Sequence, residues 1–321
     1  MNWKALLFPA RRLRQAGLLS MNQRNGDFIL PYNRRKFYPL VDDKLYTKKL
    51  AIESGIAVPE LYAVVEYEYQ IARLSELLGP HENFVVKPAH GSGGEGILIV
   101  SGRTEKGYRK LNGVLLKEAE LKHHLSNILS GMYSLGGQPD KALIEYRVEF
   151  DPVFKDISYQ GVPDIRTIVF RGIPVMSMLR LPTQQSDGKA NLHQGAIGVG
   201  IDLALGITKH AVWYEQIIGQ HPDTGHNITD LTIPYWEKML LLSASCQELV
   251  SLGYLGVDII LDAQLGPLVL EMNARPGLSI QIANNQGLLT ILKTIEKLAE
   301  IPDDPAERIK LGQDIAQKLG F

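Results

Sequence analysis

Two apolar runs near the C-terminus constrain the fold more than any other feature of the chain. Residues 256–261 and 268–273 each have the length and composition of a β-strand, and a short connection separates them, which predicts an antiparallel hairpin. Asp258 lies in the first run, while Glu271 and Asn273 lie two positions apart in the second and so share one face of the strand. A carboxylate within an apolar strand is costly unless it is paired or bound to a metal.

The three side chains together supply two carboxylates and one amide oxygen. Hard oxygen donors of this kind suit Mg²⁺ that is held partly by substrate phosphates, so Asp258, Glu271 and Asn273 are candidate metal ligands. The alternative interpretation is a pair of hydrogen-bonded strand acids. Arg275 follows directly and could bind a phosphoryl oxygen or a substrate carboxylate.

A second predicted hairpin, within residues 165–181, is flanked by more charged and polar groups. Asp164 and Arg166 share a face at the start of its first strand, Arg180 ends its second strand, and Asn191 follows in a polar loop. Arginines near a bound nucleotide would stabilise charge that develops on a transferring phosphoryl group or a tetrahedral centre. Taken alone, however, an arginine is more often part of a surface ion pair.

A glycine-rich segment follows the predicted strand 84–88. Its candidate phosphate-binding residues are Gly91, Ser92, Gly93, Gly94 and Gly96. Glycines let backbone N–H groups approach an anion closely and permit positive φ angles. The segment lacks the Gly-Lys-Ser/Thr ending of a P-loop, and a strand instead of a helix follows it, unlike the dinucleotide-binding fingerprint. Lys87 ends the preceding strand and could point at the same phosphates. An ordinary turn beside an exposed lysine is the alternative.

The remaining pattern predicts an α+β protein with antiparallel sheet and packed helices. The expected helices span about 42–54, 68–78, 116–130, 235–252, 286–299 and 305–319, and glycine-rich residues 195–206 predict loops. Cys246 is the only cysteine, which excludes an internal disulfide and a cysteine zinc site. No apolar run approaches the roughly 20 residues of a membrane span, so we expect a cytoplasmic protein.

The N-terminal segment, residues 1–41, is strongly basic although the whole chain has a formal net charge of −1. The segment contains one acidic residue, Asp27, and eight basic residues, which are Lys4, Arg11, Arg12, Arg14, Arg24, Arg34, Arg35 and Lys36. Such a segment could face an acidic or phosphorylated acceptor, or it could be a solvated basic arm.

The order of these motifs resembles the ATP-grasp superfamily, specifically the RimK-type α-L-glutamate ligases and their relatives. The resemblance runs from about Asp42 to about Leu298. It rests on Asp43-Lys44-Leu45, Phe84–Pro88 with Gly91–Gly96, Leu143-Ile144-Glu145-Tyr146, Asp164-Ile165-Arg166, Arg180, Asn191-Leu192-His193-Gln194-Gly195, Gly256-Val257-Asp258 and Leu270–Gly277.

The resemblance implies an ATP-grasp fold, in which two α+β subdomains clasp ATP, with a shortened N-terminal segment. It implies an ATP-grasp domain at 42–300, a small lid subdomain at about 80–148 within it, and a C-terminal helix at 301–321. Nucleotide contacts would come from Lys44, Lys87, the glycine segment, Glu145, Tyr146, Arg147, Val148 and Asp164. Two Mg²⁺ ions, with Mn²⁺ as a substitute, would bind Asp258, Glu271 and Asn273, while Arg166, Arg180, Asn191 and Arg275 would act in catalysis.

The activity implied is ATP-dependent ligation of a carboxylate to an amine through an acyl phosphate. The substrates would be small molecules, peptides or proteins, with glutamate or another amino acid as the added group, and a homo-oligomer is in keeping with such relatives. A kinase that phosphorylates a hydroxyl and a nucleotide-binding regulator without turnover are the alternatives. A nucleic-acid binder is disfavoured because aromatic residues are sparse in the basic segment.

Overall fold

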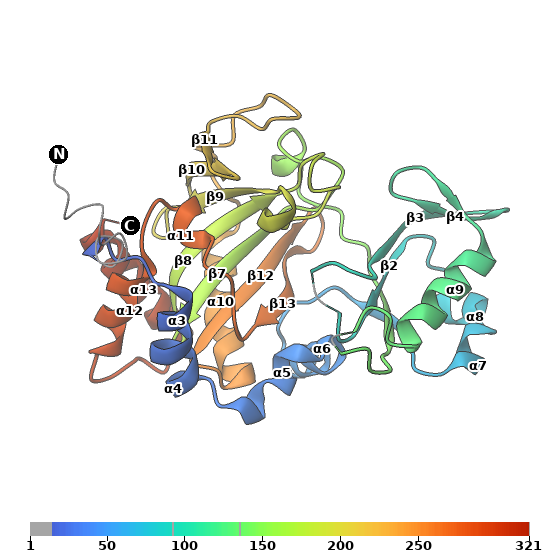
Figure 1. Cartoon of the computed structure of the whole chain (residues 1–321), viewed down its shortest axis with the longest axis horizontal. Coiled ribbons are helices and arrows are strands. Elements are labelled where there is room, and N and C mark those ends of the chain that lie inside the picture. The colour runs from blue at the N-terminus through green and yellow to red at the C-terminus, as the bar shows by residue number, and fades with distance from the viewer. Residues whose placement is uncertain (1–14, 92, 135, 321) are drawn as a thin grey trace. The chain divides into compact units, whose positions relative to one another are not determined.

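The computed structural model in Figure 1 describes residues 15–91, 93–134 and 136–320 and contains two antiparallel sheets among them. Unit 1 comprises the described residues 15–41, 53–57 and 150–320, and unit 2 comprises residues 42–52 and 58–149 without the two gaps. The mixture of helices with two antiparallel sheets confirms the predicted α+β class.

Unit 2 contains, within its described residues, a six-stranded sheet in the order β1-β6-β2-β3-β4-β5. Its elements are α6 (Lys44–Glu53) apart from its last residue, β1 (Leu61–Val65), α7 (Glu68–Ile71), α8 (Leu74–Leu78), β2 (Phe84–Pro88), β3 (Leu98–Thr104), β4 (Gly107–Lys110), β5 (Leu115–Leu116), α9 (Glu118–Leu129) and β6 (Ala142–Glu145).

The alternation of side chains along β2 and β6 decides which groups meet on each face of this sheet. Phe84 and Val86 belong to one apolar core with residues of α7, α8 and α9. Lys87 pairs in register with Leu143, which packs instead against Leu45 of α6. The face under α6 therefore receives the two charged side chains of these central strands, Lys87 and Glu145.

Unit 1 contains, within the described part of the chain, a seven-stranded sheet in the order β11-β10-β9-β8-β7-β12-β13. Its elements after residue 149 are η3 (Pro152–Phe154), β7 (Asp164–Phe170), β8 (Ile173–Leu181), η4 (Leu192–Gln194), β9 (Ile197–Ile201), β10 (Thr208–Trp213), β11 (Gln216–Ile218), α10 (Trp236–Val250), β12 (Tyr254–Asp262), β13 (Gly266–Asn273), α11 (Ile280–Ala283), α12 (Leu288–Glu296) and α13 (Pro305–Leu319).

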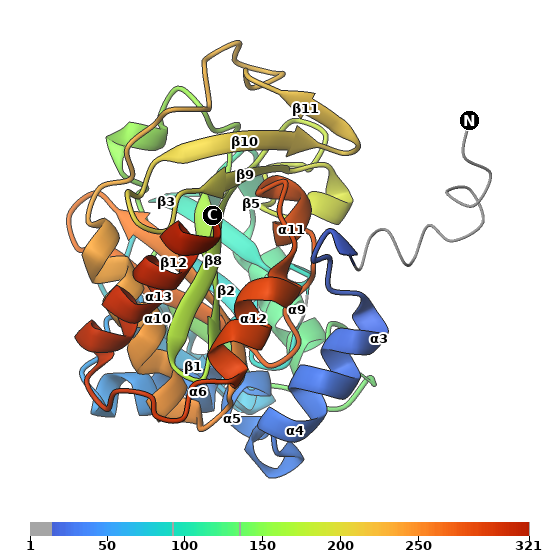
Figure 2. The same ribbon diagram turned by 90° about the vertical axis from the view of Figure 1, so that its left-hand side faces the viewer.

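Helices cover both faces of the unit 1 sheet, as Figure 2 shows with α10 and α13 on one side and α11 with the N-terminal helices on the other. Strands β8, β9 and β12 are accordingly buried along their whole length. The register of β7, β8 and β12 directs Asp164, Arg166, Arg180 and Asp258 to the same face. Helix α11 packs on that face where Gly200 of β9 approaches the Ala283 carbonyl.

The described part of the N-terminal segment, residues 15–41, packs against unit 1 through an apolar side and does not form a solvated arm. It consists of α3 (Met21–Gln23), the π-helical turn η1 (Arg24–Ile29), α4 (Leu30–Tyr32), η2 (Arg35–Phe37) and α5 (Pro39–Asp42). Phe28 is fully buried and its ring meets Phe170 edge-on at 5.5 Å. Asn33 hydrogen-bonds the backbone at both Tyr254 and Ala274. Lys4, Arg11, Arg12 and Arg14 lie outside the described residues.

Most elements expected from the sequence are present, and the differences have local causes. The predicted helix 68–78 is two short helices, α7 and α8, and the predicted helix 286–299 is confirmed as α12, with a separate short α11 before it. The prediction of loops throughout 195–206 is wrong, because residues 197–201 form strand β9. Its glycines follow from the close approach of α11, where a Cβ on Gly200 would lie 2.6 Å from the Ala283 carbonyl oxygen.

Candidate active site

A network of two carboxylates and two arginines lies on one face of the unit 1 sheet, across β7, β8 and β12. Asp258 stands opposite Arg166 in β7, and Asp164 stands opposite Arg180 in β8. Arg166 donates hydrogen bonds of 2.6 Å to both oxygens of Asp258. Arg180 donates to both oxygens of Asp164, and its Nη2 also donates to Asp258 at 2.8 Å. The two arginines and two acids therefore form one charge-assisted network.

Burial and charge act in opposite directions on the two carboxylates. Burial alone would raise the pKa of Asp258, but the guanidinium groups of Arg166 and Arg180 lower it to about 2. Burial raises the pKa of Asp164 to about 6, because Arg180 offsets the desolvation only in part and the negative charge of Asp258 adds to it. Asp258 is thus ionised at neutral pH, whereas the pKa of Asp164 lies only slightly below neutral pH.

The candidate metal ligands come together at the adjoining strand pair. Glu271 is the register partner of Asp258, and the Asn273 Nδ2 lies 3.4 Å from the Asp258 Oδ2. No group of three His, Cys, Asp or Glu side chains with metal-binding geometry occurs in the described parts of the chain, so the amide oxygen of Asn273 is needed as the third donor. Two carboxylates and an amide on one face fit Mg²⁺ that also takes phosphate ligands.

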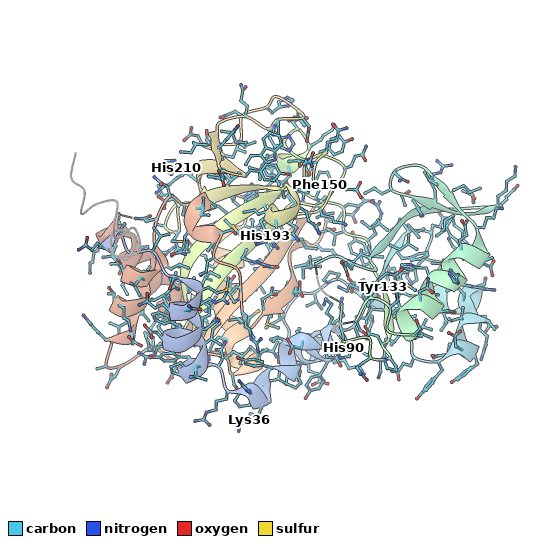
Figure 3. All side chains as sticks on the ribbon, viewed as in Figure 1. Lys36, His90, Tyr133, Phe150, His193 and His210 are labelled. Atoms are coloured by element: carbon cyan, nitrogen blue, oxygen red, sulfur yellow. The ribbon has the colours of Figure 1, made fainter. Side chains whose placement is uncertain are left out.

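The other two candidate catalytic residues of unit 1 are held by their neighbours. Asn191 caps η4, with its Oδ1 accepting from the His193 N–H at 3.0 Å, and His193 is labelled in Figure 3. The guanidinium of Arg275 lies 4.9 Å from the ring centroid of Tyr38, so the N-terminal segment helps to place it.

In unit 2, Glu145 lies buried between two lysines. Lys48 of α6 reaches its Oε2 at 2.6 Å, and Lys87 of β2 contacts its Oε1. Burial would raise the pKa of Glu145, but Lys87 and Lys48 bring it below its usual value. Burial lowers the pKa of Lys48 to about 8, although Glu145 opposes that shift. Sequence reasoning missed Lys48, yet its spacing from the buried residues Leu45 and Ala51 of α6 places it on the core side of the helix.

The glycine segment of unit 2 begins beside a third lysine, Lys44. Lys44 donates to the carbonyl of Gly91, while Gly93, Gly94 and Gly96 have φ angles of +64°, +80° and +73°. These conformations are costly for other residues, so the glycines are needed for the backbone path. Ser92, also predicted to contact phosphate, lies outside the described residues.

Side chains around the segment hold its two ends. At the start, the backbone N–H of His90 donates to buried Asp140, whose other oxygen lies 2.7 Å from the His90 ring. At the end, the His124 Nε2 bonds the Gly96 carbonyl at 3.0 Å. Gly96 packs against the ring of Tyr133. Both His90 and Tyr133 are labelled in Figure 3. The sequence pattern did not predict these supporting residues.

The predicted adenine-binding stretch directly follows Glu145, where β6 ends. The N–H of Tyr146 donates to the Glu60 carbonyl at 2.8 Å, Arg147 pairs with Glu149 at 2.8 Å, and Val148 is buried. One backbone donor of this stretch is therefore engaged within unit 2.

A family model described as sugar-transfer associated ATP-grasp matches residues 23–297. The chain belongs to this family. The ATP-grasp fold expected from the motifs is thereby confirmed, and the RimK-related assignment stays a prediction.

Several solved structures are similar to this ATP-grasp protein at low identity. The ATP-grasp ligase PsnB with a minimal precursor is 14% identical, with 92% of this chain and 73% of that chain covered and a TM-score of 0.42. D-alanine–D-alanine ligase from Bacillus anthracis with ATP is 14% identical, with 88% and 67% covered and a TM-score of 0.41. D-cycloserine synthetase DcsG is 16% identical, with 96% and 81% covered and a TM-score of 0.46. No curated protein matches the chain. Among its described helices, none is long and apolar enough to cross a membrane.

Proposed function

We propose that this ATP-grasp protein is an ATP-dependent ligase that joins a carboxylate to an amine through an acyl phosphate. The observation that carries the proposal is the buried network of Arg166, Arg180, Asp164 and Asp258. Two arginines held by carboxylates beside a candidate Mg²⁺ site are suited to stabilise negative charge on a transferring phosphoryl group.

The unit 2 residues would bind the nucleotide. Lys87 and Lys44 would contact phosphates, with Lys48 and Glu145 fixing Lys87. The glycine segment would cover the phosphates and exclude water, which protects an acyl phosphate from hydrolysis. Arg147 and Val148 would offer backbone groups to adenine, because the Tyr146 N–H already donates to Glu60.

Asp258, Glu271 and Asn273 would hold the metal, with two Mg²⁺ ions or Mn²⁺ in their place. When bound, Mg²⁺ supplies neutralisation of the β- and γ-phosphate oxygens. Both oxygens of Asp258 accept hydrogen bonds from arginines in this structure. A metal held by Asp258 would compete with these hydrogen bonds, and Arg166 and Arg180 would then be available to stabilise charge on the transferring phosphoryl group.

The chemistry would run in two steps. A carboxylate oxygen attacks the γ-phosphorus, the bond from that phosphorus to the β–γ bridging oxygen breaks, and ADP leaves. An amine then attacks the acyl carbon, the acyl–oxygen bond breaks, and phosphate leaves while the nitrogen gives up a proton. No protein nucleophile is required, in keeping with Cys246, whose burial raises the pKa of its thiol to about 12.

The substrates belong to the same proposal. Amino acids such as glutamate, as in RimK-type ligases, and peptide or protein acceptors fit the reaction. The description of the family as sugar-transfer associated adds saccharide carboxylates and amino sugars. An ATP-consuming reaction of this kind suits the cytoplasm.

The test measures ADP, free phosphate and product mass with MgATP and a panel of carboxylates and amines. Wild-type protein is compared with Glu271→Gln and with Glu300→Gln, an exposed carboxylate in the same unit. Coupled release of ADP and phosphate with an amide product, lost only in Glu271→Gln, is expected. ADP with a phosphorylated acceptor and no free phosphate would make the protein a kinase. Bound MgATP without turnover across the panel would favour a nucleotide-binding regulator.

A further inference from the structure

The β10–β11 hairpin lies at the edge of the unit 1 sheet (Figure 1), and the two aromatic residues Trp213 and Tyr214 lie at its turn. The rings of Trp213 and Tyr214 lie 5.5 Å apart at an angle of 46°. Tyr214 is 53% exposed although it is a large, partly apolar side chain. An exposed ring beside a half-buried one offers an aromatic surface to a ligand.

The backbone at Tyr214 takes a conformation that tyrosine rarely adopts. Trp213 pairs with Gln216, so Tyr214 and Glu215 form a two-residue hairpin turn, and Tyr214 has φ +53°. Asparagine and glycine are the usual residues of such turns because they accept positive φ. Strained residues of this kind concentrate at functional sites, where the surrounding structure holds them in place.

The turn brings the Tyr214 hydroxyl over the loop that follows β8. A Cβ on Gly195 would lie 2.6 Å from the Tyr214 Oη and 2.8 Å from the Gln185 Cγ, so both side chains converge above Gly195. Gly195 itself has φ +102°. The Tyr214 hydroxyl and the Gln185 side chain therefore lie close together at this turn.

Hydrogen bonds hold this arrangement in place. The Gly195 carbonyl accepts from the Thr183 hydroxyl and from the Trp213 indole N–H, both at 2.8 Å. The Gln184 N–H donates to Asp223 at 2.7 Å. The aromatic surface is thus tied to the loop by side chains from separate segments, which preorganises it.

The surface also lies close to the candidate catalytic residues along the sheet. Leu181, next to Arg180, pairs with Ile197, two residues after Gly195. Asn191 belongs to the same loop. A molecule resting on Trp213 and Tyr214 would be held at the end of the strand that carries Arg180.

We propose that Trp213, Tyr214, Gln185 and the Gly195 turn form a subsite for a pyranose ring of the substrate that is ligated. The C–H groups of a pyranose face carry partial positive charge and are attracted to the negative face of an aromatic ring, while its hydroxyls need amide and phenol partners. The inference rests on the proposed ligase function and adds a substrate class to it.

The test uses saturation-transfer NMR on the full chain without nucleotide, so that failure of the ligase reaction does not hide the result. The probes are methyl β-D-glucopyranoside, methyl β-D-galactopyranoside and N,N′-diacetylchitobiose, with tri-glutamate as the non-sugar comparison. MgATP binding is measured separately by calorimetry.

Tyr214→Ala is expected to weaken binding of the best saccharide at least about tenfold, which corresponds to about 1.4 kcal/mol. Tyr214→Phe, which keeps the ring, should lose less. Tyr235→Ala is the matched control, because Tyr235 is also exposed, at 58%, and has φ +57°. It should leave saccharide binding unchanged.

Three results would overturn the subsite. The first is absence of saturation transfer to every saccharide from a folded protein that binds MgATP. The second is equal weakening of saccharide binding by Tyr214→Ala and Tyr235→Ala. The third is a response confined to tri-glutamate. Saccharide binding that depends on Tyr214 in a protein that fails to bind MgATP would support the subsite and count against the ligase proposal.

Discussion

At the scale of single residues, the charge network of unit 1 makes Arg180 the side chain on which two buried acids depend. It donates to both Asp164 and Asp258, and its own pKa is raised further by these carboxylates in spite of burial. Removing one partner of a buried ion pair leaves an uncompensated charge, which is far more costly than the pair itself was worth.

Arg180→Ala is therefore expected to lower the free energy of unfolding by about 3–5 kcal/mol. Urea unfolding followed by circular dichroism measures it. Arg73→Ala is the control, because Arg73 pairs with Glu76 on the exposed surface and should cause little change. Equal effects of the two substitutions would contradict the network as described.

Lys48 gives stability a pH dependence at the same scale. Its pKa is lowered from 10.5 to about 8 because burial disfavours the charged form. Between these two values the unfolded chain binds more protons than the folded chain, so this group makes stability rise with pH from about 8 to 10.5. Below pH 8 the buried charge is a cost that the ion pair with Glu145 offsets only in part.

Lys48→Met should remove that rise, on the order of 3 kcal/mol across the window. The measurement is the free energy of unfolding at pH 7, 8, 9 and 10 for wild type, Lys48→Met and Lys49→Met. Lys49 is the exposed neighbour in α6 and serves as the control. If the free energy of unfolding changes with pH in the same way in wild type and in Lys48→Met, then burial does not lower the pKa of Lys48.

At the scale of elements, hydrogen bonds from the N-terminal segment connect the two strands that carry the candidate metal ligands, β12 and β13. The Asn33 amide donates to the carbonyls of Tyr254 at 2.7 Å and Ala274 at 2.9 Å, and its oxygen accepts from the Tyr254 N–H at 2.8 Å. Arg24 donates to the Pro276 carbonyl at 2.6 Å. The start of β12 and the end of β13 are thus held together next to Asn273.

Asn33→Ala should cost about 2–4 kcal/mol of stability, because buried backbone groups lose their partners. It should also raise the Mg²⁺ concentration needed for half-maximal ATP turnover, measured at a temperature where the variant is folded. Asn227→Ala, an exposed asparagine with bonds to its own turn, is the control. If folded Asn33→Ala needs the same Mg²⁺ concentration as wild type, then the hydrogen bonds of Asn33 contribute to stability alone.

The sequence predicted best what depends on neighbours along the chain. Both hairpins, the α6 helix and the face shared by Glu271 and Asn273 follow from local sequence signals and are present. The bond from Arg180 to Asp258 required the order β8-β7-β12, which joins strands about 80 residues apart in the chain and which no local pattern encodes. The basic residue Arg24 looked solvated for the same reason, since its acceptor, Pro276, is distant in sequence.

At the scale of the whole molecule, the ligase proposal assigns parts of one nucleotide-binding function to both units. Lys87 and Glu145 belong to unit 2, whereas Asp258, Glu271 and Asn273 belong to unit 1. A ligand that binds only the folded protein stabilises it by mass action, by about 2.7 kcal/mol at a concentration of 100 times its dissociation constant.

MgATP should therefore raise the melting temperature of the wild-type chain, and a single substitution in either unit should reduce that rise. Lys87→Ala should remove most of this rise because a phosphate contact is lost. Glu271→Gln should remove only the part that depends on Mg²⁺ and leave the smaller rise caused by ATP with EDTA.

The melting temperature is measured by thermal unfolding without ligand, with ATP and EDTA, and with MgATP. Lys106→Ala and Glu300→Gln, both at exposed positions, are the controls. If Lys87→Ala abolishes the rise while Glu271→Gln leaves the Mg²⁺-dependent part intact, unit 1 does not hold the metal, and the roles assigned to Asp258, Glu271 and Asn273 are wrong.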